Sequence, residues 1–118
     1  MTMIKMVEPK EWETYLYAFT ARNRGRRARF EIFGPKGGFK EEEQEGDFAS
    51  ISIEGNKVTV TRHYDNHGEQ KVMVDELNNV RGISVQYDTD NSVNVLEFAD
   101  DKGGMTTLHF ESKVDGVS

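Results

Sequence analysis

The sequence predicts an α+β domain, in which one N-terminal amphipathic helix packs on a twisted or half-curled antiparallel sheet of about six to seven strands. Near the N-terminus, apolar residues recur every three to four positions, which is the period of a helix. From residue 26 onward they recur at every second position between short turns, which is typical of strands joined by hairpins. We expect the helix over 9–24 and the sheet over 26–112, within a single domain spanning 1–118.

The helix has a start, an apolar face and a stop in its sequence. Pro9 suits a first helical turn, because the N–H group that it lacks would have no helical partner there. Gly25 suits the left-handed conformation that commonly follows a last turn. The face between them consists of Trp12, Tyr15, Leu16 and Phe19. We expect Trp12, Leu16 and Phe19 to pack on the concave side of the sheet.

Seven short strands follow the helix. Their expected ranges are 27–32, 48–54, 58–64, 69–74, 80–87, 93–98 and 106–110. Residues 40–47 are expected to form a loop or an edge segment, 75–79 a helical turn or a corner, and 114–118 a frayed tail. In the sixth strand the apolar residues change phase after Val95, which predicts a β-bulge or two buried faces.

Composition excludes several kinds of site. The 118 residues include no cysteine, so disulfides, thiolate metal ligands, iron–sulfur clusters and cysteine nucleophiles are ruled out. The net charge of −6 makes general attraction to nucleic acid unfavourable. The apolar start is interrupted at Glu8-Pro9 and resembles no secretory signal, and no run is long enough to cross a bilayer. We expect a soluble, cytoplasmic protein with no membrane contact.

Three segments of the chain resemble a small bacterial domain family of unknown function. They are Glu11-Trp12 with Phe19 in the same helix, the strand Phe30-Glu31-Ile32-Phe33-Gly34, and the ending Gly104-Met105-Thr106-Thr107-Leu108-His109-Phe110. The resemblance covers nearly the whole chain and implies a free-standing bacterial domain. No established activity, cofactor or site residue follows from it.

A cluster of arginines is the most conspicuous polar feature. Five of them lie within eight residues, at Arg22, Arg24, Arg26, Arg27 and Arg29. Arginine binds carboxylates and phosphates well, so Arg26, Arg27 and Arg29 are candidate residues for binding an anion or a partner. The alternative is that the helical arginines complement the C-terminal end of the helix dipole while those of the strand form a solvent face.

No catalytic or metal-binding set stands out. The acidic run over 41–47 lacks the ligand spacing of a calcium loop and is expected to be a solvated segment that offsets the arginines. His63 and His67 straddle a strand end and a turn, so their four-residue spacing does not place them together as it would on a helix. His109 alternates with Leu108 and Phe110 and should face away from them.

These observations favour a non-enzymatic binding or accessory module without a cofactor, acting through a surface near the arginine cluster. An acidic protein is the partner that its charge suggests. One alternative is a small-molecule binder or enzyme with an apolar pocket between helix and sheet, using Tyr15, His63 or His109. Another is weak nucleic-acid binding through the arginines, which the acidic charge disfavours. The sequence leaves the oligomeric state open.

Overall fold

The computed structural model describes residues 3–41, 45–90 and 92–111. In chain order its elements are β1 (Met3–Val7), the 3₁₀ turn η1 (Pro9–Glu11), α1 (Trp12–Asn23), β2 (Arg27–Phe33), β3 (Phe39–Glu41), β4 (Gly46–Glu54), β5 (Lys57–Asn66), β6 (Glu69–Leu77), β7 (Val80–Tyr87), β8 (Val93–Asp100) and β9 (Met105–Phe110). Within the described ranges, no helix is long and apolar enough to span a membrane.

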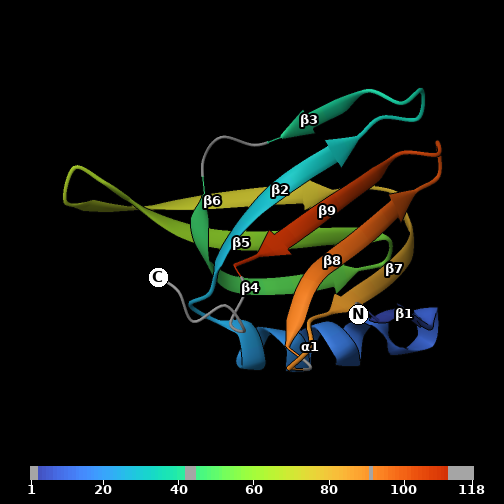
Figure 1. Ribbon diagram of the computed structural model, residues 1–118, viewed down its shortest axis with the longest axis horizontal. Helices are drawn as coiled ribbons and strands as arrows, with labels where there is room; N and C mark the ends of the chain where they lie inside the picture. Colours follow the sequence, from blue (N-terminus) through green and yellow to red (C-terminus); the bar gives the residue numbers. More distant parts are fainter. Residues whose placement is uncertain (1–2, 42–44, 91, 112–118) are drawn as a thin grey trace.

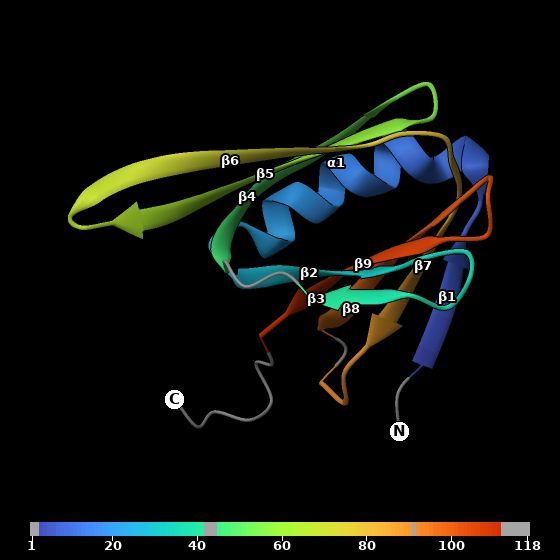
Figure 2. The same cartoon turned by 90° about the horizontal axis from the view of Figure 1, so that it is seen from above.

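All the strands belong to one antiparallel sheet, in the order β1-β7-β8-β9-β2-β4-β5-β6, with β3 added beside β2. Most neighbours are joined by hairpins, which explains their antiparallel pairing. The sheet folds back on itself between β2 and β4 (Figure 1). Figure 2 shows the result, two layers with α1 between them: β4–β6 on one side, and β2, β7, β8 and β9 on the other. The predicted α+β class and the single N-terminal helix are confirmed.

The apolar face of α1 joins the two layers into one core. Trp12, Leu16 and Phe19 are buried, as the sequence predicts. The ring of Phe19 lies 5.6 Å from Phe48 of β4 and 5.5 Å from Phe110 of β9, both in edge-on arrangements. Aromatic pairs of this geometry add to the hydrophobic contribution of the area that they bury. The helix therefore contacts both layers through a single side chain.

A buried arginine also joins the layers, where the sheet divides. Strand β2 pairs with β9 along one edge, but on the other edge its first two residues pair with β4 and its last three with β3. Arg62 of β5 reaches β2 at this division and donates a 3.1 Å hydrogen bond to the Ala28 carbonyl oxygen. Its guanidinium lies 4.6 Å from the Phe30 ring centroid and 3.1 Å from an Asp75 carboxylate oxygen. Arg62 has no solvent-exposed surface.

The structure has two strands that the sequence does not predict, which makes nine in place of six to seven. Residues 3–7 form β1, which pairs with β7 of the same chain. Residues 39–41 form β3 beside β2, which overlaps the start of the segment over 40–47 expected to be a loop or an edge segment. Neither has a strong alternating pattern, because β3 is exposed on both faces and β1 lies at the edge of the sheet. Residues 42–44 of the acidic run, and the predicted frayed tail, lie outside the described residues.

Of the helical turn or corner expected over 75–79, the helical turn is wrong, whereas a corner is present at the end of this range, where the chain passes from β6 in one layer to β7 in the other (Figure 2). Strand β6 continues to Leu77, and only Asn78 and Asn79 connect it to β7. Asn79 adopts a positive φ of 58°, which asparagine tolerates better than most residues. The sequence pattern did not reveal the last part of β6 because this part contains charged residues. Such residues are tolerated there because β6 is partly exposed to solvent along its length.

The predicted bulge in the sixth strand is confirmed. Tyr87 of β7 pairs with Val93 and the adjacent Gln86 with Val95, so Asn94 is the extra residue in β8. Val93 and Val95 are both buried, but only Val93 lies in the main apolar core with Leu96. The bulge turns Val95 out of the main apolar core and onto the opposite side of the sheet.

Substituting Gly46 tests the packing at the start of β4. A Cβ atom there would lie 2.8 Å from the Met73 methyl carbon, 3.1 Å from the Arg62 Cβ and 3.2 Å from the His63 carbonyl oxygen. We expect Gly46→Ala to lower the free energy of unfolding by about 1–3 kcal/mol in urea denaturation. Gly82→Ala is the matched control, because its Cβ would have its nearest neighbour at 3.7 Å. Equal stability of the two variants would contradict this packing.

Candidate functional site

Arg26 is half-buried, and its guanidinium forms hydrogen bonds with other groups of the chain. Its Nη1 donates to the Asn23 side-chain oxygen at 2.9 Å and to the Val93 carbonyl at 2.8 Å, and its Nη2 donates to the Glu111 carbonyl at 2.8 Å. The guanidinium also lies 5.0 Å from the Phe110 ring centroid. Burial lowers the pKa of Arg26, while the nearby aspartates at 88 and 90 oppose that shift. The side chain fastens the end of α1 to β8 and β9.

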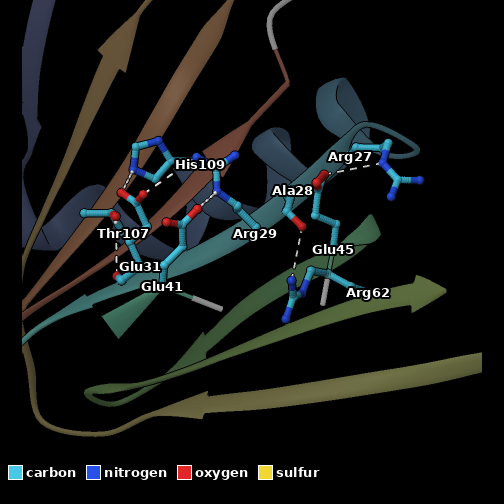
Figure 3. Close-up of polar contacts among 9 residues, drawn as sticks. All are labelled: Arg27, Ala28, Arg29, Glu31, Glu41, Glu45, Arg62, Thr107 and His109. Carbon is cyan, nitrogen blue, oxygen red and sulfur yellow. Dashed lines mark hydrogen bonds and ion pairs between the residues drawn. The ribbon is translucent and has the colours of Figure 1, made fainter. Parts of the chain in front are cut away.

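Arg27 and Arg29 instead form ion pairs at the surface. The Arg27 Nε lies 3.5 Å from a Glu45 carboxylate oxygen, and the Arg29 Nε lies 3.1 Å from one of Glu41. The two arginine side chains keep 54% and 38% of their surface exposed. Exposed pairs of this kind contribute about 0–1 kcal/mol each, so their guanidinium groups can exchange partners at little cost. Figure 3 shows both arginines and their partners.

The remaining arginines of the cluster lie on α1 and beyond its end. Arg22 is exposed in the last turn, and the Nε of Arg24 donates to the Ala49 carbonyl oxygen at 3.3 Å. The five arginines that cluster in the sequence therefore lie in three different places. Two lie at the end of the helix, one bonds within the protein, and two lie on a surface of the sheet. They do not form one continuous basic patch.

Glu31 organises the surface around Arg29, and the sequence does not single it out. His109 of β9 places its Nε2 2.5 Å from one Glu31 oxygen, and the Arg29 Nη2 lies 3.7 Å from the other. The Glu31 side chain is only 14% exposed. Residues at 29 and 31 of β2 alternate with the buried Ala28 and Phe30, so strand period alone places them on one face. The pairing register of β2 and β9, which places His109 opposite Arg29, cannot be read from the sequence pattern.

A hollow of about 330 Å³ opens on the same face of the sheet. Its lining consists of Arg27, Ala28, Arg29, Glu45, His109 and Glu111. Two of the three candidate arginines thus meet a histidine from a neighbouring strand at one depression. A mixed lining of two guanidinium groups, an imidazole and two carboxylates is suited to hydrogen bonding and ion pairing with a polar ligand.

The other histidines lie elsewhere. His63 pairs with Asp47 and Val72 across the β4–β5–β6 layer, and His67 occupies the β5–β6 turn with a φ of 55°. Among the residues that the structure describes, no three histidine, aspartate or glutamate side chains are grouped so that they could hold a metal ion.

A second polar feature is Tyr15, which lines two hollows beside α1. One, of about 280 Å³, lies between the helix and the ends of β7 and β8; the other, of about 240 Å³, lies toward β1. Arg22 lines both of them. Burial raises the pKa of Tyr15, hydrogen bonding to Tyr87 raises it further, and Arg22 opposes the rise. The phenol therefore stays protonated at neutral pH and can act as a hydrogen-bond donor.

Comparison with known proteins gives no match among protein-family models, curated proteins or solved structures. The resemblance to a bacterial domain family thus remains an expectation from the sequence.

The protonated state of Tyr15 predicts a loss of stability at alkaline pH. Its pKa is raised in the folded protein above the ordinary value of 10.0, so unfolding releases a proton once the pH exceeds that value. The contribution of Tyr15 is complete below pH 10 and falls as the pH rises further. We expect Tyr15→Phe to flatten the decline in unfolding free energy above about pH 10.

Tyr17→Phe is the control for this measurement, because Tyr17 is 82% exposed on the same helix. It should leave the alkaline decline as steep as in the unmodified protein. If the two variants change the pH dependence equally, the environment assigned to Tyr15 is incorrect.

Proposed function

We propose that the protein is a binding module whose hollow beside Arg27, Arg29 and His109 receives carboxylate groups of a polypeptide partner. The supporting observation is the convergence of these three side chains, from β2 and β9, on one depression of about 330 Å³. A partner carboxylate would replace a weak intramolecular contact of Arg27 or Arg29 and form a bidentate pair with the guanidinium.

The positions of these side chains favour binding. Arg29 is held between Glu31 and Glu41, so its guanidinium is oriented before a partner arrives. A preorganised side chain loses less conformational entropy on binding than a free one. Arg26 contributes by fastening α1 to the adjacent strand ends, and does not take part in the contact itself.

The charge of the chain restricts the partner. With a net charge of −6, the protein as a whole repels a strongly acidic polymer. A partner that presents one or two carboxylates in an otherwise neutral segment avoids that repulsion and still engages both arginines. Nucleic acid would have to contact a continuous run of cations, and the arginines of this chain are divided among three places.

A titration with short peptides tests the proposal. The probe is a peptide that carries two glutamates among otherwise uncharged residues, and its matched control carries glutamine at those two positions. We expect the glutamate peptide to shift the amide resonances of Arg27, Arg29 and His109, with an affinity that falls as salt rises. The combined variant Arg27→Gln and Arg29→Gln should weaken binding at least tenfold, a change of about 1.4 kcal/mol.

Arg81→Gln controls for the loss of a positive charge, because Arg81 is exposed on β7 away from the hollow. It should bind the glutamate peptide as the unmodified protein does. Equal affinity for the glutamate and glutamine peptides, or undiminished binding by the double variant, would refute the proposal.

The hollows beside Tyr15 support a second candidate, a site for a small amphipathic carboxylate. Arg22 could pair with the carboxylate, while Tyr15, Phe19 and Val93 offer apolar ring and side-chain contact. Amide shifts from a small carboxylate that centre on Tyr15 and Tyr87, with none at His109, would favour this candidate over the peptide site.

A further inference from the structure

Strand β6 forms one edge of the sheet. It spans nine residues and pairs with β5 through nine consecutive positions without a shift in register. Within the described part of the chain it has no second neighbour. Interruption by a bulge or by a proline is among the features that discourage an edge strand from pairing with another chain. Neither interruption occurs in β6, and the β5–β6 hairpin extends beyond the rest of the molecule at the left of Figure 1.

The geometry of the hairpin determines which backbone groups face the open edge. Its turn is His67-Gly68, with positive φ values of 55° and 84° that match a type I′ turn. In such a turn the flanking residues, Asn66 and Glu69, exchange backbone hydrogen bonds with each other. Every second residue of β6 after Glu69 then directs its N–H and C=O groups away from β5. These residues are Gln70, Val72, Val74 and Glu76.

The sequence of β6 is complementary to itself when a second copy lies antiparallel to it. Backbone groups of the open edge can meet only if outward-facing residues pair with outward-facing residues. This condition is met when Met73 of one copy lies opposite Met73 of the other. In that register, which is centred on Met73, all nine residues of β6 are paired. Val72 then lies opposite Val74, and Lys71 lies opposite Asp75, each pairing occurring twice.

Neighbouring registers lack this complementarity. Centring the pair on Val72 places Lys71 opposite Met73 and brings Glu69 opposite Asp75, which repel each other. Centring it on Val74 places Lys71 opposite Leu77 and leaves Asp75 opposite Met73. Only the register centred on Met73 forms two opposite-charge pairs and joins the valines.

The exposure of these side chains agrees with that register. Val72 and Val74 are each 59% exposed, and pairing would bring four valines together on the outer face of the sheet. Lys71 and Asp75 keep 40% of their side chains exposed, although Lys71 contacts Glu69 and Asp75 contacts Arg62. We infer that β6 binds the β6 strand of a second copy of this chain, antiparallel and centred on Met73, so that the sheet continues across a two-fold dimer.

Single cysteines can test the register, because the natural chain has no cysteine. At the centre of the pair, Met73 lies opposite its own copy with a Cα separation of about 4.5 Å, which is within the disulfide range. We expect Met73→Cys to form a covalent dimer rapidly under mild oxidation. Val72→Cys and Val74→Cys should cross-link more slowly, because each is offset from its own copy. Cross-linking that is fastest at 72 or 74, or equally slow at all three positions, would overturn the inference.

The oligomeric state of the unmodified protein provides an independent test. Light scattering should give a mass approaching twice 13.5 kDa as concentration rises. Lys71→Asp places two pairs of aspartates opposite each other and should shift this equilibrium toward monomer, whereas Lys5→Asp on the opposite edge strand should not. Circular dichroism confirms that both variants are folded. A monomer up to millimolar concentration, or equal effects of the two substitutions, would refute the β6 dimer.

Discussion

The structure depends on a buried guanidinium at the point where the sheet divides. Strand β2 changes neighbour from β4 to β3, and between those pairings no strand of the described residues pairs with this edge. Arg62 crosses from the other layer, donates to the Ala28 carbonyl and stacks on Phe30. A buried charge is costly to desolvate, so it is retained only where carbonyl, carboxylate and aromatic contacts compensate for that cost. Arg62 has all three kinds of contact, and these contacts connect β5 and β6 to β2.

The shape of the sheet determines where the two candidate surfaces lie. Because the sheet folds around α1, the helix buries Trp12, Leu16 and Phe19 between the layers and leaves the outer faces of both layers available. The arginine-lined hollow lies on the outer face of the β2–β9 layer, and the open edge of β6 belongs to the other layer. The hollow and the proposed dimer interface are therefore separate, and a dimer would present two hollows, which would increase avidity for a partner with repeated sites.

Local pattern predicted much of the fold, because helix and strand periods are properties of neighbouring residues. The face of α1 and the bulge before Val95 are both readable in this way. The pattern failed for β1, whose partner β7 lies far away in the sequence, and for β3, which is exposed on both faces. It also failed for the end of β6, where Asp75 faces an internal arginine that local composition does not reveal.

The candidate site was predictable only in part. Alternation placed Arg27 and Arg29 on one strand face, but it could not show that Arg26 bonds internally to Val93 and Glu111. The meeting of Arg29 with His109 depends on strand register over 80 positions of sequence separation, since the two residues are paired across β2 and β9. Arg62 had a readable signal, because it follows Val58 and Val60 in phase and so falls on the buried face of β5.

The most direct test of the structural role of Arg62 is the unfolding free energy of Arg62→Met, measured by denaturant titration against Lys57→Met. Both variants replace a cation of β5 with an apolar side chain of similar length, but the Lys57 pair with Glu76 is exposed. If Arg62 joins the layers, Arg62→Met should lose about 2–4 kcal/mol and Lys57→Met less than about 1 kcal/mol. Equal stability of the two variants would show that the layers are held together without the buried guanidinium.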